Sequence, residues 1–131
     1  DRRGKLTRVL TWELEWGPRV PSLLKMQEGG MEVPALQNRP QMTQWVIEYW
    51  EAFQTLGNSR IPHQGGIGPI PLTEIVAYMD AIYLYDVDER LRMIKMIQSL
   101  DRVYMKHVND KAARQREMDS KKRKTTAPRR R

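Results

Sequence analysis

The most conspicuous chemical possibility in the sequence is a phosphate-binding loop in the stretch IPHQGGIGPIPLTEI at residues 61–75. Three glycines stand within four positions there, and a helical pattern follows them. A phosphate loop presents converging backbone N–H groups, usually with a Lys and a Ser or Thr at the start of the helix. Here three prolines each remove a donor, no Lys is present, and Glu74 puts a negative charge in the first helical turn. We therefore interpret the glycines as backbone freedom for a long loop and Pro71 as a helix start.

Other side chains that could carry a reaction are few. The two histidines, His63 and His107, are too far apart for a two-histidine helix motif, and the chain has no cysteine. The acidic group Asp86, Asp88 and Glu89 lacks the glycine and the remaining oxygen ligands of a calcium loop, and helix capping accounts for it. We therefore expect a non-enzymatic protein with no catalytic residue, no cofactor and no metal site.

The charge of the chain is concentrated at one end. Residues 112–131 hold nine Lys or Arg and two acids, whereas residues 1–111 hold fourteen of each sign, so the net charge of +7 belongs to the last twenty residues. Contact with nucleic acid is therefore expected through this arm alone. No apolar run is long enough to span a membrane, and we expect no membrane contact. The absence of cysteine fits an intracellular protein.

Residues 1–37 give the weakest pattern. The stretch LTRVLTWELEW fits either a short amphipathic helix or a strand, because its large apolar residues satisfy both periods. Gly17-Pro18 ends that element. The stretch VPSLLKMQEGG then predicts a short helix that stops at Gly29-Gly30.

The clearest helix is predicted to start at Asn38, with Asn38 as cap, Pro40 in the first turn and Gln41 reaching back as in a capping box. Gly57-Asn58 is predicted to end the helix with a residue in the left-handed conformation. The apolar residues of this helix follow one another at steps of three or four and form one aromatic-rich stripe. They are Met42, Trp45, Val46, Tyr49, Trp50, Phe53 and Leu56. The stripe can form half of a core, or its aromatics can anchor a partner.

Two further helices are predicted after the glycine loop. The first begins at Pro71 and turns Leu72, Ile75, Val76, Met79 and Ile82/Tyr83 to one face. The second is capped by Asp86 and runs from Val87 to about Lys111 or beyond. Its apolar residues cover more than half of the circumference, which predicts either a central helix or an extra contact edge. We place that edge at Met93, Met96, Leu100 and Val103, since methionine suits an adaptable contact surface.

Together these patterns predict an all-α fold, a small helical bundle of three to four main helices with a disordered basic C-terminal arm. The expected organisation is an N-terminal segment at 1–37, a helical domain at 38–111 and the arm at 112–131. The arm is either a solvated tail or an electrostatic contact for nucleic acid or an acidic partner. Its candidate contact residues are Lys121, Lys122, Arg123, Lys124, Arg129, Arg130 and Arg131.

The order of these signals also resembles a known family. An aromatic N-R-P helix (PALQNRPQMTQWVIEYWEAFQTLGNSR) leads into a glycine loop that closes as GIGPIP. Two helices follow (LTEIVAYMDAIYLYDVDERLRMIKMIQSLDRVYMKHVN) with an L-D-x-x-Y pattern at Leu100, Asp101 and Tyr104. Over residues 34–110 this is similar to the small helical proteins encoded near the tape-measure gene of tailed bacteriophages and prophages. Those proteins are regarded as tail assembly chaperones or their frameshift extensions.

The resemblance implies a chaperone in the host-cell cytoplasm that covers apolar stripes of the tape-measure protein until the tail tube forms around it. The expected partner-binding residues are the edge at Met93, Met96, Leu100 and Val103 and the exposed parts of Trp45, Tyr49 and Trp50. Self-association through the same surface is a further possibility. Two alternatives stay open: a structural tail or neck component of the virion, and a nucleic-acid-associated protein that uses the arm.

Overall fold

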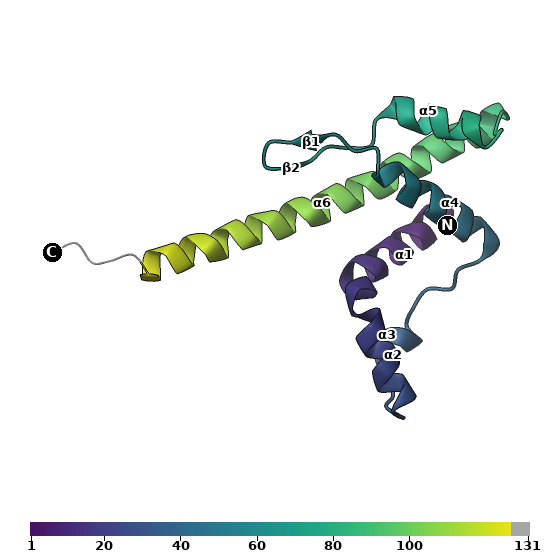
Figure 1. Cartoon of the computed structure of the whole chain (residues 1–131). Coiled ribbons are helices and arrows are strands. Elements are labelled where there is room, and N and C mark those ends of the chain that lie inside the picture. The colour runs from purple at the N-terminus through teal and green to yellow at the C-terminus, as the bar shows by residue number, and fades with distance from the viewer. Residues whose placement is uncertain (127–131) are drawn as a thin grey trace.

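The computed structural model describes residues 1–126 and shows an all-α fold with one short β-hairpin. The helices, in chain order, are α1 (Arg2–Trp16), the 3-10 turn η1 (Gly17–Arg19), α2 (Val20–Glu28), α3 (Pro34–Gln37), α4 (Gln44–Gly57), α5 (Leu72–Ala81) and α6 (Val87–Thr126). The hairpin strands are β1 (Pro62–His63) and β2 (Gly66–Ile67), paired antiparallel. Figure 1 shows α1, α4 and α5 gathered around the first half of α6, while the second half of α6 projects away from them.

The hydrophobic core lies where α1, α4, α5 and α6 meet. Each helix contributes buried apolar side chains at helical spacing, so the four stripes close over one another. The fully enclosed members are Leu6 and Leu10 of α1, Val46 of α4, Ile75 and Met79 of α5, and Ile97 and Leu100 of α6. The bundle predicted from the apolar periodicity is therefore confirmed, with α6 as the central helix.

The N-terminal stretch that fitted either a helix or a strand is the helix α1. Its side chains at Leu6, Val9 and Leu10 enter the core, and a helix is the element that brings these positions to one side. Trp12 ties the following segment to α1, because its indole Nε1 donates to the Ala35 carbonyl at 2.9 Å. The guanidinium of Arg39 lies 4.6 Å from the Trp12 ring centroid, so the segment after α3 is fixed as well.

The N-cap of α4 lies five residues later than the sequence predicts. Asn38 is the C-terminal cap of α3, and the N-cap of α4 is Thr43, with an extended backbone. The contact of Arg39 with α1 explains the difference, since it holds this segment against another helix and the chain must then cross to α4. The predicted left-handed end of α4 is also wrong: Asn58 is right-handed, and the Ser59 hydroxyl closes the helix end by donating to the Leu56 carbonyl at 2.6 Å.

The glycine-rich stretch forms the β1–β2 hairpin. Gly65 has a φ of +87° at the tip, a conformation that side-chain-bearing residues rarely adopt. At Gly68 a Cβ atom would lie 2.6 Å from Nε2 of His63 and 2.9 Å from the Ile61 carbonyl oxygen, so the close approach of the two strands requires a glycine there. The interpretation of these glycines as backbone freedom is confirmed.

A buried ion pair holds the hairpin to α6. Arg60 and Asp101 pair through Nη2 and Oδ1, and their side chains are only 7% and 9% exposed. The second carboxylate oxygen of Asp101 accepts from the backbone N–H of Ile70 at 3.0 Å. Arg60 also donates to the Gly68 carbonyl at 3.0 Å, and its guanidinium stacks 4.5 Å from the ring centroid of Tyr104. The L-D-x-x-Y pattern thus closes the base of the glycine loop.

A short hydrogen-bonded corner joins α5 to α6. Helix α5 ends with Tyr83 in the left-handed region at a φ of 59°, and the Leu84 N–H bonds back to the Met79 carbonyl at 2.9 Å. Asp86 caps α6 as predicted, since its Oδ2 accepts from the Glu89 N–H at 3.0 Å. Arg90 of α6 donates to the Leu84 carbonyl at 2.9 Å and so reaches back across the corner.

The arm differs from its prediction. Helix α6 continues without a break to Thr126, so residues 112–126 are helical and not disordered. The acid–base spacing along the helix gives it local support, including the Lys106–Asp110 pair at 3.7 Å and the Gln115–Asp119 hydrogen bond at 3.1 Å. Basic residues in its last turn also suit the negative end of the helix dipole. Arg129, Arg130 and Arg131 lie outside the described residues.

Candidate partner-binding surface

The predicted contact edge on α6 is not a surface. Met93, Met96 and Leu100 are only 6%, 8% and 1% exposed, and all three belong to the core. Val103 is half-buried and packs against that core. The apolar arc of α6 is wide because three helices, α1, α4 and α5, cover it from different sides. The expectation of an exposed methionine edge is therefore wrong, and central packing accounts for these residues.

The aromatic stripe of α4 divides between the core and two grooves. Tyr49 and Phe53 are buried, whereas Trp45 and Trp50 are half-buried and lie at the edges of the helix. Trp45 packs edge-on against Tyr49 with ring centroids 6.3 Å apart, and Trp50 lies 6.0 Å from Phe53. The two tryptophans thus extend the core outward on opposite flanks of α4.

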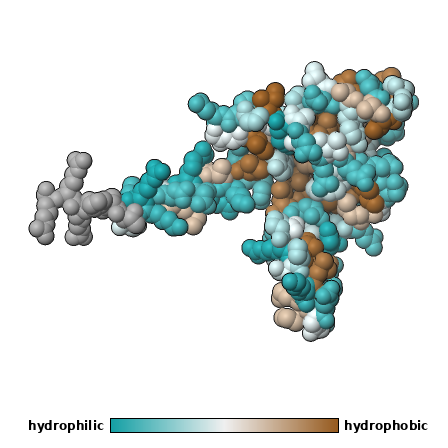
Figure 2. All heavy atoms as spheres, in the orientation of Figure 1, coloured by the Kyte–Doolittle hydropathy of each residue, from teal (hydrophilic) through white to brown (hydrophobic). Residues whose placement is uncertain are grey.

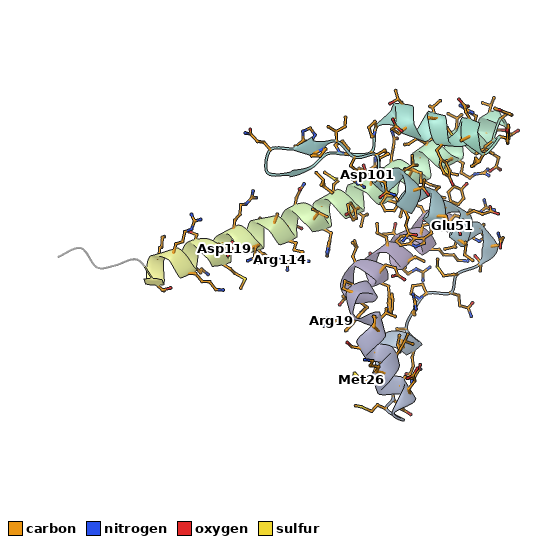
Figure 3. All side chains as sticks on the ribbon, in the orientation of Figure 1. Arg19, Met26, Glu51, Asp101, Arg114 and Asp119 are labelled. Carbon is orange, nitrogen blue, oxygen red and sulfur yellow. The ribbon has the colours of Figure 1, made fainter. Side chains whose placement is uncertain are left out.

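The first groove, called the Trp45 groove below, has a volume of about 260 Å³ and lies between α4, α5 and the start of α6. Its lining includes Tyr78, Leu84 and Met93 and three carboxylates, those of Glu48, Glu51 and Glu89, with Arg2 as the single base. The face of Trp45 is covered from within the chain, because the Arg2 guanidinium and the Lys5 ammonium lie 5.4 and 6.0 Å from its ring centroid. Glu51 marks this part of α4 in Figure 3.

Two tyrosines of the Trp45 groove have perturbed acidity. Burial raises the pKa of Tyr49, and the negative charge of Glu89 adds to that effect. Burial also raises the pKa of Tyr78, with Glu51 contributing in the same direction. Both phenols therefore stay neutral at physiological pH. At neutral pH these two side chains therefore present hydroxyl groups and apolar ring surface to the groove.

The second groove, the Trp50 groove, has a volume of about 500 Å³ and lies between α1, η1, α4 and α6. Its apolar wall consists of Leu10, Leu14, Trp50, Phe53 and Tyr104. Polar side chains line the same groove, and they are Glu13, Gln54, Asn58 and Arg60. Protein-binding sites combine apolar and polar side chains in this way, and a half-exposed tryptophan is a frequent anchor in them.

A third apolar surface escaped the sequence analysis. The α5–α6 corner exposes five large apolar side chains within ten residues: Ile82, Tyr83, Tyr85, Val87 and Leu91. The sequence pattern assigned Ile82 and Tyr83 to the same face as Ile75 and Met79, but helix α5 ends at Ala81, so the helical spacing no longer applies to them. The two tyrosines contact each other edge-on at 6.3 Å. The signal that could have found this surface is the pair of tyrosines directly before the cap Asp86.

Space-filling colours agree with this division. Figure 2 shows apolar residues gathered where the helices meet and at the α5–α6 corner, while the projecting half of α6 is almost entirely hydrophilic. The candidate contacts Lys121, Lys122, Arg123 and Lys124 all lie on that half and are exposed.

Within the described residues, no His, Asp and Glu side chains form a group of three that could hold a metal ion. No helix among residues 1–126 has the length and apolar character needed to cross a membrane.

Comparison with protein families gives one match. The family described as phage tail assembly chaperone matches residues 26–106, which is more than half of the chain. The chain belongs to the phage tail assembly chaperone family. The matched residues of this chaperone run from the end of α2 through the Arg60–Asp101 pair and stop near the point where α6 leaves the bundle. No curated protein and no solved structure gives a significant match.

The family match changes how the flanking elements are interpreted. Most of α1 precedes the matched residues, yet its side chains at Leu6, Val9 and Leu10 complete the core of this chaperone and its Leu14 lines the Trp50 groove. The projecting half of α6 follows the matched residues. The family resemblance drawn from the sequence is confirmed, together with a role in tail assembly through contact with phage tail proteins.

Proposed function

We propose that this protein acts as a non-enzymatic chaperone that holds an apolar helical segment of the tape-measure protein in the Trp50 groove. The chaperone would act in the host cell during tail assembly. A tape-measure protein is a long helical chain, and its apolar stripes need a cover before the tail tube forms. The observation that carries the location is the half-exposed Trp50, which lines this groove beside Leu10, Leu14, Phe53 and Tyr104.

The Trp50 groove is favoured over the Trp45 groove for two physical reasons. Arg2 and Lys5 already lie over Trp45, so a partner would have to displace charged side chains from the ring. The three carboxylates around Trp45 would also have to lose water on binding, which costs free energy unless the partner is basic. The Trp50 groove has one carboxylate and one base in its lining, and both are already paired within the chain, Glu13 with Arg39 and Arg60 with Asp101. The cost is therefore smaller there, and burying a tryptophan face contributes through both area and stacking.

The proposal is tested by co-expression of the chaperone with fragments of the tape-measure protein from the same phage. We expect the chaperone to co-purify with a fragment that carries an apolar helical stripe, and Trp50→Ala to weaken this association by about tenfold or more, the usual cost of removing an aromatic anchor. Trp16→Ala is the matched control, because Trp16 is also half-buried but lies outside both grooves.

A further variant separates the groove from the α5–α6 corner. In Tyr83→Ser/Tyr85→Ser the exposed pair of rings is removed without touching either tryptophan. We expect this variant to bind as the unchanged protein does. Loss of binding in the corner variant with normal binding in Trp50→Ala would move the site to the corner. No co-purification with any tape-measure fragment would refute the proposal altogether.

A further inference from the structure

The last part of α6, from Lys111 to Thr126, is a basic helix that projects from the bundle (Figure 1). All side chains from Ala113 to Thr125 are exposed, and the helix projects beyond the bundle, as the positions of Arg114 and Asp119 in Figure 3 show. At 1.5 Å per residue, this exposed stretch is about 20 Å long. From Lys111 to Thr126 it carries seven bases and two acids, whereas residues 1–111 are neutral overall. This charge lies outside the residues matched by the chaperone family.

The bases of this helix form two stripes on nearly opposite sides. At about 100° of rotation per residue, each stripe spans an arc of about 100°, and the two arcs face away from each other. Stripe one consists of Lys111, Arg114, Lys121 and Lys122, and stripe two of Arg116, Arg123 and Lys124. One acid lies in each gap between the stripes, Glu117 on one side and Asp119 on the other. The gap of Asp119 spans about 100° and also holds Ala112 and Gln115, so the carboxylate of Asp119 is the one charge among these three residues.

This pattern favours a groove over a flat partner. An acidic protein surface would contact one side of the helix and leave the opposite stripe in water, so half of the charge would contribute little. In the major groove of B-form DNA, phosphates line both walls, and both stripes face negative charge at once. The groove is about 12 Å wide and an α-helix is 10 to 12 Å across, so the dimensions agree. The major groove of duplex RNA is too deep and narrow for side chains to enter.

We propose that the projecting half of α6 binds double-stranded DNA by lying in the major groove, with stripes one and two against the phosphates of its two walls. The Asp119 gap then faces the base edges. It holds one amide, Gln115, which donates to Asp119 at 3.1 Å and is thereby engaged within the helix. Binding is therefore driven by phosphate contacts and shows little preference for sequence. This activity is separate from tape-measure binding, which uses another part of the molecule.

The test is fluorescence anisotropy of the full-length protein on labelled DNA and RNA duplexes of equal length and mixed sequence. We expect micromolar binding to DNA, weaker binding to RNA, and a loss of about 10³-fold in DNA affinity between about 50 and 200 mM salt, as for about six phosphate contacts. Two triple variants each remove three charges while keeping a good helix former at each site. They are Lys111→Gln/Arg114→Gln/Lys121→Gln in stripe one and Arg116→Gln/Arg123→Gln/Lys124→Gln in stripe two.

Each triple variant should lower the slope of log K against log salt by about 3, because each removes about three released counterions. The matched control removes three exposed bases from the bundle, in Arg3→Gln/Lys25→Gln/Lys95→Gln, and should keep the slope of the unchanged protein. Circular dichroism of each variant checks that the helices are retained.

Several outcomes would overturn the proposal. If only one stripe matters, the helix binds a single face and does not lie in a groove. Equal or tighter binding to duplex RNA, or tighter binding to poly-glutamate than to DNA, would assign the arm to a different polyanion. If the control variant lowers the salt slope as much as the stripe variants do, the binding depends on net charge alone and not on this helix.

Discussion

Replacing Asp101 by Asn tests whether the buried ion pair holds the hairpin to α6. Asp101 receives a charged hydrogen bond from Arg60 and another from the Ile70 N–H, and neither charged side chain is more than 9% exposed. Asn keeps an oxygen for Ile70, but it leaves the Arg60 guanidinium buried without a countercharge. Removing one partner of a buried pair costs about 3 to 5 kcal/mol, and the retained Ile70 bond places the expected loss near about 3.

The loss is large compared with a total stability of about 5 to 15 kcal/mol. It is measured by urea unfolding, followed by tryptophan fluorescence and circular dichroism. With a urea dependence of about 1.5 kcal/mol per molar, the midpoint should fall by about 2 M. The matched control is Asp110→Asn on the same helix, whose pair with Lys106 is mostly exposed, and its unfolding free energy should change by less than about 0.5 kcal/mol.

A double-mutant cycle with Arg60→Met separates the pair from its surroundings. Arg60→Met alone removes the bond to the Gly68 carbonyl and leaves the Asp101 carboxylate buried and unpaired. The double variant leaves no buried charge, so it should be more stable than the sum of the two single losses implies, by about 2 kcal/mol or more. If Asp101→Asn lowers the unfolding free energy by less than about 1 kcal/mol, or if the two single losses simply add in the double variant, the buried ion pair does not hold the hairpin to α6.

Two further predictions concern the hairpin and the buried phenol. Gly68→Ala should lower the unfolding free energy by about 1 to 3 kcal/mol, because its Cβ would collide with the His63 ring. Gly66→Ala is the control and should change the unfolding free energy little, because its Cβ would meet nothing within 4 Å. Thermal unfolding of the two variants measures the difference between them. The pKa of Tyr49 is raised in the folded state, so the unfolded state loses its proton first and stability should fall as the pH rises through and above 10. Tyr49→Phe should show a shallower fall between pH 8 and 11 in urea unfolding, and equal slopes in the two proteins would contradict this assignment.

Local sequence signals predicted most of the helices. The capping pattern at Asp86 set the start of α6, and Pro21 with Gly29-Gly30 framed α2, since these residues act through their own backbone and nearest neighbours. The interpretation of the glycine loop as structural also followed from local chemistry, because three prolines remove backbone donors there and Glu74 places a negative charge in the first turn of α5. Periodicity turned Ile75 and Met79 to one face of their helix, and both are in the core.

Errors arose where distant contacts decided the outcome. The start of α4 was misplaced because Arg39 is held by Trp12 of α1, a contact over 27 residues of sequence that no local pattern reveals. The exposed corner at Tyr83 and Tyr85 was missed because a face assignment assumes that the helix continues. The methionine edge of α6 was misjudged because a wide apolar arc can meet either three neighbours in the chain or one partner outside it, and the sequence of α6 is the same in both cases.

The sequence by itself determined the helical class, the neutral bundle with its basic end, and the resemblance to tail assembly chaperones, because these depend on residue types and short-range spacing. Only the tertiary structure decided which apolar surface is free. It buried Met93, Met96 and Leu100, left Trp50 at the edge of a groove, and brought Arg60 and Asp101 together across 41 residues of chain. The physical reason is that burial is a property of the assembled helices, since each helix covers its neighbours and none of them contains that information alone.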